Sequence, residues 1–330
     1  MILQQTRGLL SSGDQLALDL PFAETKSLAA RIGPTPTFTR ASTATFVGSN
    51  GLIQTAAVNA ARFDHDPVTL ASRGLLIEEG RTNLVFPSDT LTTQTRTVTA
   101  TAHTLSFYGT GTVVLSGVAI ATVTGTGAFP TRTTLTFTPT AGSLILTVTG
   151  SVTEAQLEEG SFPTSYIPTT TSALARSADV CSITGANFTN LWNASEGTMY
   201  IEADPSRMPA SLGGNRTIVG FSSGTYSSQV MSIAKSSTFG RIETYINNAR
   251  TYSANNLNPF RAAIAVRTGS NSSALGGVIT ANTTSSILTA DRLQFRDPIG
   301  AAAGHPTCTI AAFRYYKKRL PNAKLVTLTT

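Results

Sequence analysis

The most regular feature of the sequence is a series of short apolar runs separated by turn-forming residues. In TLTFTP (134–139), Leu135 and Phe137 alternate with threonines, and a period of two places successive side chains on opposite faces of a strand. Such runs at intervals of about 8–12 residues, bounded by Gly, Asn and Ser, are typical of β-sandwiches. Other runs of this kind are TLSFYG (104–109), TVVLSGVAI (112–120), SLILTVTG (143–150), GTMYIEAD (197–204), RTIVGFS (216–222), VMSIAK (230–235), GRIETYI (240–246), RAAIAVR (261–267) and CTIAAFRYY (308–316).

Helical patterns are almost absent. No apolar i, i+3, i+4, i+7 pattern extends over three turns, and the nearest approach, residues 14–31, is interrupted by Pro21. The sequence therefore predicts an all-β fold of tandem jelly-roll-type β-sandwiches that follow a mostly irregular N-terminal segment.

Shifts in composition divide the chain into three expected parts. Residues 1–80 are mixed and irregular, residues 81–168 are rich in Thr and poor in charge, and residues 169–330 contain the single Trp and both Cys. The stretch IPTTTS (167–172) is interpreted as a linker, because proline fixes a turn and hydroxyl residues offer no apolar surface to bury. We expect an attachment or oligomerisation segment at 1–80 and sandwiches at 81–168 and 169–330.

Composition and charge exclude several classes of protein. Of the 330 residues, 54 are Thr and only 13% are charged, about half the usual ~25%, and the net charge is +6. Nucleic-acid binding is not expected, because the one dense basic run, Lys317 to Arg319, does not form a basic stripe. The sequence contains no run of about 20 apolar residues, so membrane insertion is not predicted. The N-terminus lacks the pattern of a secretory signal.

Clusters of titratable residues in the first half of the chain are interpreted as structural. In the run from Arg62 to Pro67, Asp66 is expected to cap a turn and Arg62 to pair with a carboxylate, although His65 with its aspartates also suits a general base or a metal ligand. Arg81 is expected to fold back and form an ion pair with Glu78 or Glu79, and the same pairing logic applies at Glu158 and Glu159. Adjacent carboxylates on a strand point to opposite faces and do not make a glycosidase pair.

Glu202 and Asp204 are the strongest enzymatic candidates, because alternation along residues 197–204 places both on one face of a strand. A retaining glycosidase needs two carboxyl groups about 5 Å apart across the scissile bond, and a third carboxylate of the concanavalin-A-like glucanase pattern is missing here. A solvated strand end is the favoured interpretation, a calcium or sugar contact is the alternative, and no enzymatic activity is expected.

Cys181 and Cys308 are expected to be buried thiols.

Three groups of stretches resemble a family of tailed-phage structural proteins, comprising tail-fibre, spike and head-fibre subunits, with related subunits in gene transfer agents. The first group is FTRASTATFVGSNGLIQTA (38–56), ARFDHDP (61–67) and GLLIEEGRTNLV (74–85). The second, EAQLEEGSFPTSYIPTT (154–170) with ARSADVCSI (175–183), resembles the end of a carbohydrate-binding-module jelly roll. The third, AAFRYYKKRLPNAKLVTLT (311–329), resembles the end of a concanavalin-A-like, laminin-G-like sandwich.

The resemblance implies a virion-surface spike or fibre subunit that binds host-cell surface polysaccharide. Its expected partners are other virion proteins at a capsid vertex or tail, the host polysaccharide, and copies of itself as a trimer or pentamer. A ligand-free capsid or tail decoration is the alternative, and a capsule depolymerase is a third. Assembly in the bacterial cytoplasm follows from the missing signal. No cofactor is assigned, although hydroxyl- and carboxylate-lined sandwich loops are compatible with Ca²⁺.

Candidate glycan-binding residues combine aromatic rings with amide and guanidinium groups in the C-terminal part. Sugars stack on aromatic rings while Asn and Arg bond their hydroxyls, so that a site needs both types of residue. The stretch YINNARTY (245–252) supplies both, although Asn247-Asn248 also suits the turn of a plain hairpin. The complete candidate set is Trp192, Tyr226, Tyr245, Asn247, Asn248, Arg250 and Tyr252.

Overall fold

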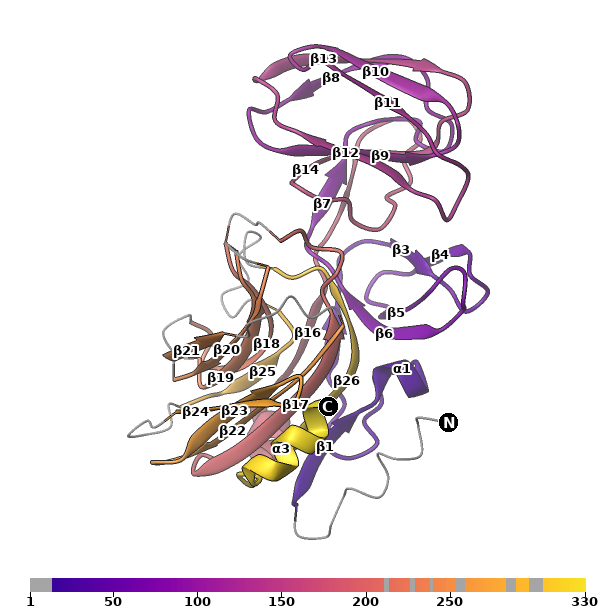
Figure 1. The fold of residues 1–330 in the computed structure, drawn as a ribbon. Coiled ribbons are helices and arrows are strands. Elements are labelled where there is room, and N and C mark those ends of the chain that lie inside the picture. The colour runs from indigo at the N-terminus through magenta and orange to yellow at the C-terminus, as the bar shows by residue number, and fades with distance from the viewer. Residues whose placement is uncertain are drawn as a thin grey trace. The chain divides into compact units, whose positions relative to one another are not determined.

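The computed structural model describes residues 14–210, 214–225, 229–237, 240–247, 249–252, 259–282, 289–296 and 305–330. Strands dominate this part of the chain, which contains three short helices: α1 (Phe22–Thr25), α2 (Gly185–Leu191) and α3 (Asn322–Thr329) (Figure 1). The prediction of an all-β fold is confirmed.

Two compact units divide the chain, and neither is continuous in sequence. Unit 1 comprises Met1–Thr39, Ser72–Ile77 and Val180–Thr330, and unit 2 comprises Arg40–Ala71 and Glu78–Asp179. This division differs from the three parts expected from composition, because residues before position 80 are shared between both units.

The first sheet of unit 1 is antiparallel and centres on the long strand β26. Its order is β24 (Val278–Asn282), β23 (Asn271–Leu275), β22 (Phe260–Arg267), β17 (Glu196–Asp204), β26 (Cys308–Tyr316) and β6 (Ser72–Ile77), with β1 (Leu16–Leu20) also paired with β26. Helix α3 packs on β22 and β23, where Leu325 and Leu328 join a cluster with Tyr200 and Tyr316.

The second sheet of unit 1 has seven strands. Their order is β2 (Thr37–Thr39), β16 (Val180–Thr184), β25 (Arg292–Gln294), β18 (Arg216–Ser222), β19 (Met231–Lys235), β20 (Ile242–Ile246) and β21 (Ala249–Tyr252).

A layer of aromatic rings joins the two sheets of unit 1. Phe221 of β18 lies 4.9 Å from Tyr315 of β26, and Phe295, directly after β25, lies 5.2 Å from Phe313 (distances between ring centroids). Tilted and edge-to-face rings at such distances are favourable beyond the area that they bury. The two sheets therefore form a sandwich whose core is aromatic.

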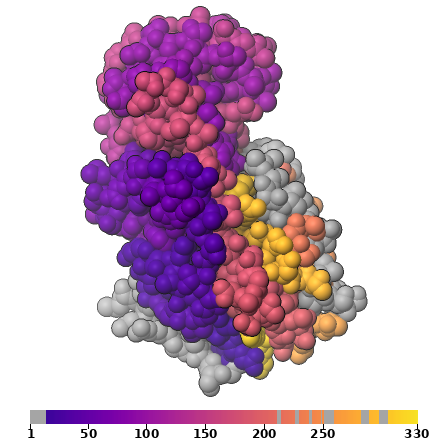
Figure 2. All heavy atoms as spheres, turned by 180° about the vertical axis from the view of Figure 1, so that it is seen from behind, coloured from indigo at the N-terminus to yellow at the C-terminus, as the bar shows by residue number. Residues whose placement is uncertain are grey.

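The N-terminal residues of unit 1 are not the mostly irregular segment that the sequence suggested. Strand β1 pairs with β26, β2 pairs with β16, and β6 pairs with β26. In Figure 2 the indigo residues of this part lie against pink and yellow residues of the same unit. Alternation failed to reveal β1 and β2, because they have only five and three residues and their partners lie in the second half of the sequence.

Unit 2 contains a smaller sandwich. A four-stranded sheet, with the order β11 (Ala121–Thr124), β10 (Thr112–Gly117), β13 (Gly142–Thr149) and β8 (Gln94–Val98), faces a three-stranded sheet, with the order β12 (Thr133–Phe137), β9 (His103–Tyr108) and β14 (Thr153–Glu159). Phe107 and Leu157 from one sheet pack with Leu115 and Leu146 from the other in a single buried cluster. The strands predicted at 104–109, 112–120, 134–139 and 143–150 are confirmed, with slightly different ends.

The remainder of unit 2 consists of short strands and loops. These are the hairpin of β3 (Ala44–Val47) and β4 (Ile53–Ala56), strand β5 (Arg62–His65), and the pair of β7 (Arg81–Asn83) and β15 (Leu174–Arg176). The stretch 167–172, interpreted from sequence as a linker, lies entirely inside unit 2. Thr169 is buried there because its hydroxyl donates to the Val85 carbonyl at 2.6 Å and its backbone N–H donates to Ser88 Oγ.

Five buried charged side chains form what we call the ionic core of unit 2: Arg40, Arg62, Glu78, Arg176 and Asp179. Arg62 Nη1 lies 2.7 Å from Glu78 Oε2, and its Nη2 contacts Asp179. Arg40 reaches Asp179 at 3.1 Å, and Arg176 reaches Glu78 at 3.0 Å. Each of these side chains is at most 1% exposed. Burial opposes the charge of Arg62, but Asp179 and Glu78 outweigh it, so that the pKa of Arg62 lies above its ordinary value.

The structure confirms two sequence interpretations near this core and corrects a third. Arg62 does pair with carboxylates, and Asp66 does cap a turn, because its Oδ1 accepts hydrogen bonds from the backbone of Val68 and Thr69. The residues from Arg62 to His65, however, form a strand rather than part of that turn. Within the described residues, no group of three potential ligands is arranged for a metal ion.

Replacing Arg62 with Ala is expected to lower the free energy of unfolding by about 3–5 kcal/mol, because it leaves Glu78 and Asp179 without their shared partner in a buried site. Urea unfolding followed by far-UV circular dichroism measures the effect. Arg31→Ala is the matched control: Arg31 is 39% exposed and pairs with Asp19, so a loss below about 1 kcal/mol is expected. Equal losses in the two variants would contradict a special role for the ionic core.

Candidate functional site

Helix α2 carries the candidate site. Gly185 follows β16 with a φ of +59°, a conformation that glycine adopts without strain, and this turns the chain from the strand into the helix. At about 100° per residue, Phe188 and Leu191 fall on one side and are buried, whereas Ala186, Thr189 and Asn190 fall on the opposite side and are exposed. The two remaining sides of the helix each line a cavity of unit 1.

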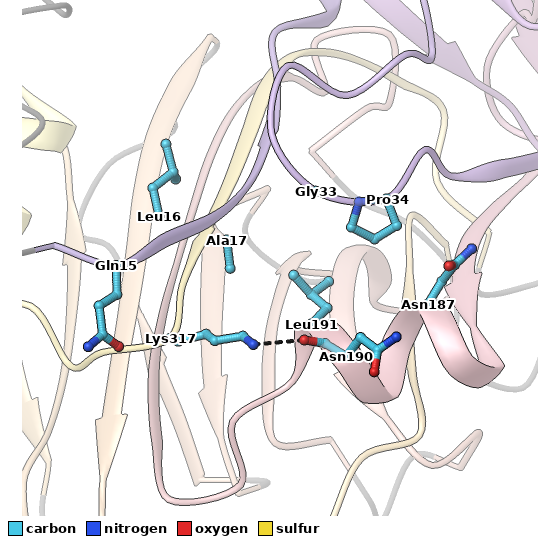
Figure 3. A pocket seen from close by; sticks show the side chains of 9 residues that line it. All are labelled: Gln15, Leu16, Ala17, Gly33, Pro34, Asn187, Asn190, Leu191 and Lys317. Atoms are coloured by element: carbon cyan, nitrogen blue, oxygen red, sulfur yellow. Dashed lines mark hydrogen bonds between the residues drawn. The ribbon is translucent and has the colours of Figure 1, made fainter. Parts of the chain in front are cut away.

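The larger cavity, called here the amide cavity, has a volume of about 670 Å³. Figure 3 shows α2 on one side of it and β1 on the other. It is lined by Gln15, Leu16, Ala17, Gly33, Pro34, Asn187, Asn190, Leu191 and Lys317.

Lys317 is the one charged side chain among the nine residues that line the amide cavity. It follows β26 directly, is half-buried, and its Nζ donates a hydrogen bond to the Asn190 carbonyl at 2.7 Å (Figure 3). A lysine ammonium carries three N–H donors. Two of them have no acceptor among the residues that the structure describes.

The second cavity, called here the tryptophan cavity, has a volume of about 480 Å³ and lies along the other side of α2. Arg292 Nε donates to Asp291 Oδ1 at 2.6 Å, and this hydrogen bond lowers the pKa of the Asp291 carboxyl below its ordinary value. The lining residues are Thr184, Gly185, Phe188, Thr189, Trp192, Ala194, Ala290, Asp291 and Arg292. Both cavities fall in the range of about 300–1,000 Å³ that is common for small-molecule sites.

Trp192 both anchors the core and lines the tryptophan cavity. Its ring stacks at 5.8 Å on Phe188 and on Tyr315, and lies 5.0 Å from Phe221. The residue is only half-buried, and its indole N–H has no acceptor among the described residues. The two roles that the sequence left open for Trp192, core anchor and aromatic platform, are therefore compatible.

The hairpin predicted at 245–252 is confirmed. Tyr245 lies opposite Arg250, Ile246 lies opposite Ala249, and Asn247 has the φ of +47° that such a turn requires. The Tyr245 hydroxyl donates to Glu243 Oε2 at 2.6 Å and accepts from Asn215 Nδ2 at 2.7 Å. Burial, together with the hydrogen bond and the negative charge of Glu243, raises the pKa of Tyr245 to about 12.

The structure brings only some of the predicted glycan-binding residues together. Tyr245 and Arg250 are neighbours, but α2 contacts β16 and β25, and β25 lies three strands from β20 in the sheet. At about 4.8 Å per strand, this separates the hairpin from α2 by about 14 Å. Tyr226 and Asn248 lie outside the described residues, as does the side chain of Tyr252. A glycan-binding role for the hairpin remains a prediction.

Sequence reasoning missed most of the side chains that accompany Trp192. Gln15, Asp291 and Arg292 belong to no motif, Asn187 stands in an Asn-Phe-Thr triplet to which no role was given, and Lys317 was noticed only as part of a basic run. Gln15 lies just before β1, Asn187 lies in α2, Arg292 begins β25 and Lys317 follows β26, so nothing in the local sequence links them.

The candidate carboxylate pair lines neither cavity. Glu202 forms an ion pair with Arg261 at 3.3 Å and accepts a hydrogen bond from the Tyr200 hydroxyl. Asp204 accepts the backbone N–H of Ser206. Cys181 and Cys308 are buried and form no disulfide, which confirms the prediction of thiols. Among the described helices, none is long and apolar enough to cross a membrane.

Comparisons with known proteins give matches among solved structures alone. No protein-family model matches the sequence, and the search of curated proteins found no match. Trypanosoma rangeli sialidase in complex with sialic acid has a TM-score of 0.35 at 10% identity over 45% of this chain and 25% of its own. The CBM40 module of the Ruminococcus gnavus IT-sialidase, bound to α2,3-sialyllactose, has a TM-score of 0.34 at 11% identity over 44% of this chain and 88% of its own. A botulinum neurotoxin type C structure, whose description concerns two ganglioside molecules, has a TM-score of 0.35 at 11% identity over 46% of this chain and 39% of its own. This chain thus spans about a quarter of the sialidase.

Replacing Tyr245 with Phe tests whether the hydroxyl is structural. The raised pKa means that Tyr245 contributes stability below about pH 10, its unfolded value, and loses that contribution as the pH rises to about 12. We expect Tyr245→Phe to lower the free energy of unfolding at pH 8 by about 1–2 kcal/mol, because Glu243 loses a donor. Above pH 10, the free energy of unfolding of the variant is expected to decline less steeply than that of the wild type. Urea unfolding between pH 8 and 11.5 measures both effects, and parallel pH profiles would contradict the assignment.

Proposed function

We propose that this protein is a virion-surface spike or fibre subunit that binds polysaccharide on the host cell surface through the tryptophan cavity. One observation carries the binding part of the proposal: a half-buried indole, whose N–H has no acceptor among the described residues, lines the same cavity as a carboxylate, a guanidinium and two threonines. Saccharides present apolar C–H faces and hydroxyls together, so this mixture of an aromatic ring and polar groups suits them.

The virion part of the proposal rests on the sequence stretches that resemble phage spikes and fibres, and exposed apolar residues support it. Leu52, Val58, Val68 and Leu70 are 48–75% exposed, and all belong to residues 1–80, the part expected to attach to other virion proteins. A symmetric trimer or pentamer presents several copies of a weak sugar site, and avidity then strengthens adsorption without any new contact.

A second candidate, a decoration or connector without ligand, is favoured for unit 2. The cavity described there, between β3 and the segment around Tyr166, has a volume of about 50 Å³, room for a few water molecules. A depolymerase is less favoured, because Arg261 pairs with Glu202 and the pair of Glu202 and Asp204 lines neither cavity of α2.

The proposed function is tested by binding the fluorescently labelled, purified full chain to host cells with and without their capsular polysaccharide. Capsule-dependent binding that free capsule competes away is the expected result. Absence of binding, with the oligomeric state established by mass, would favour the decoration or connector role.

Two arginine substitutions locate the binding site. Arg292→Ala is expected to weaken capsule binding about tenfold, because a charged hydrogen-bond donor in the tryptophan cavity is lost. Arg250→Ala removes the same side chain from the hairpin, where it is 45% exposed, and is expected to leave binding within twofold of the wild type. Fluorescence titration of both variants measures this, and the opposite pattern would move the site to the β20–β21 hairpin.

A further inference from the structure

Building on the proposed function, we propose that the polysaccharide carries carboxylate groups and that the amide cavity holds one of them against Lys317. A single oligosaccharide then lies across α2, with one sugar in the tryptophan cavity and an acidic sugar in the amide cavity.

The charges of the two cavities differ. In the tryptophan cavity Arg292 is paired with Asp291, so that its net charge is zero. In the amide cavity Lys317 has no acidic residue among its lining neighbours, and its one described partner there is the neutral Asn190 carbonyl. An ammonium with donors to spare in a half-buried position attracts an anion, and a carboxylate is the anionic group typical of acidic sugars.

The amides of this cavity suit the hydroxyls around such a carboxylate. Gln15, Asn187 and Asn190 are exposed, and their side chains form no hydrogen bond with any described residue. Each amide offers two donors and one acceptor, which match the donor and acceptor character of sugar hydroxyls. Leu16, Pro34 and Leu191 line the same cavity with apolar surface.

The position of the two cavities sets the size of the ligand. They lie on opposite sides of one helix, and a helix with its side chains is about 10–12 Å wide. Thr189 and Asn190 on the exposed ridge between them each line one cavity. A ligand that fills both cavities is therefore an oligosaccharide rather than a single sugar.

The test uses an array of acidic bacterial polysaccharides, each printed beside its carboxyl-reduced, neutral form, with the full-length protein as the analyte. We expect binding to at least one acidic polymer and a loss of about fivefold or more in apparent affinity for its reduced form. Equal binding to both forms would overturn the acidic-sugar proposal and leave saccharide binding intact. Absence of binding to every polymer would overturn both.

A matched pair of lysine variants assigns the effect to the amide cavity. Lys317→Met is expected to weaken binding of the acidic form about fivefold and to change binding of the reduced form less than twofold. Lys318→Met removes the same charge from the neighbouring exposed residue, which lines neither cavity, and is expected to bind like the wild type. Thermal unfolding checks that both variants fold, and Lys317→Arg, which keeps the charge, is expected to retain preference for the acidic form. Equal losses in both Met variants would attribute the effect to net charge and overturn the site.

Discussion

Unit 2 depends on ion pairs between charged groups that are almost completely removed from water. Arg40, Arg62 and Arg176 come from separate stretches of the chain, and each reaches Glu78 or Asp179. A buried charge without its partner costs several kcal/mol, whereas the complete set adds little net stability over apolar side chains of similar size. We therefore see the ionic core as a device that specifies which segments meet. Hydroxyls complete it, because Ser165 donates to Glu78 and Thr164 accepts from Arg176.

In unit 1 the aromatic layer fixes the position of the candidate site. Trp192 is held between Phe188 and Tyr315, so the end of α2 is fixed to β26 at the centre of the opposite sheet. The same strand leads directly to Lys317, which bonds the last turn of the helix. Trp192 is thus held by core packing and Lys317 by a hydrogen bond before a ligand arrives. Preorganised groups of this kind lose less entropy on binding.

The sequence predicts the parts of this protein whose partners are close in the chain. The strands of the smaller sandwich alternate cleanly, as at Leu135 and Phe137, and their neighbours follow within a few tens of residues. Strands β1 and β2 were missed because they are short and pair with distant segments. Helix α2 was missed because seven residues hold less than two full periods. For the candidate site, Trp192 was identifiable by residue type. Lys317 and Arg292 can be identified as candidates only from the side chains that folding places beside them.

The interleaving of the two units has a consequence for biosynthesis. A ribosome completes unit 2 when it has added Asp179, and domains generally fold as units in the order in which they emerge. Strands β1 and β6 are made early, but β26 follows only after roughly 6–27 s of further translation beyond Asp179, at about 5–20 residues per second. During that interval their edges are unpaired and open to association with other chains. The last strand to be synthesised therefore determines when the nascent protein stops being vulnerable to aggregation.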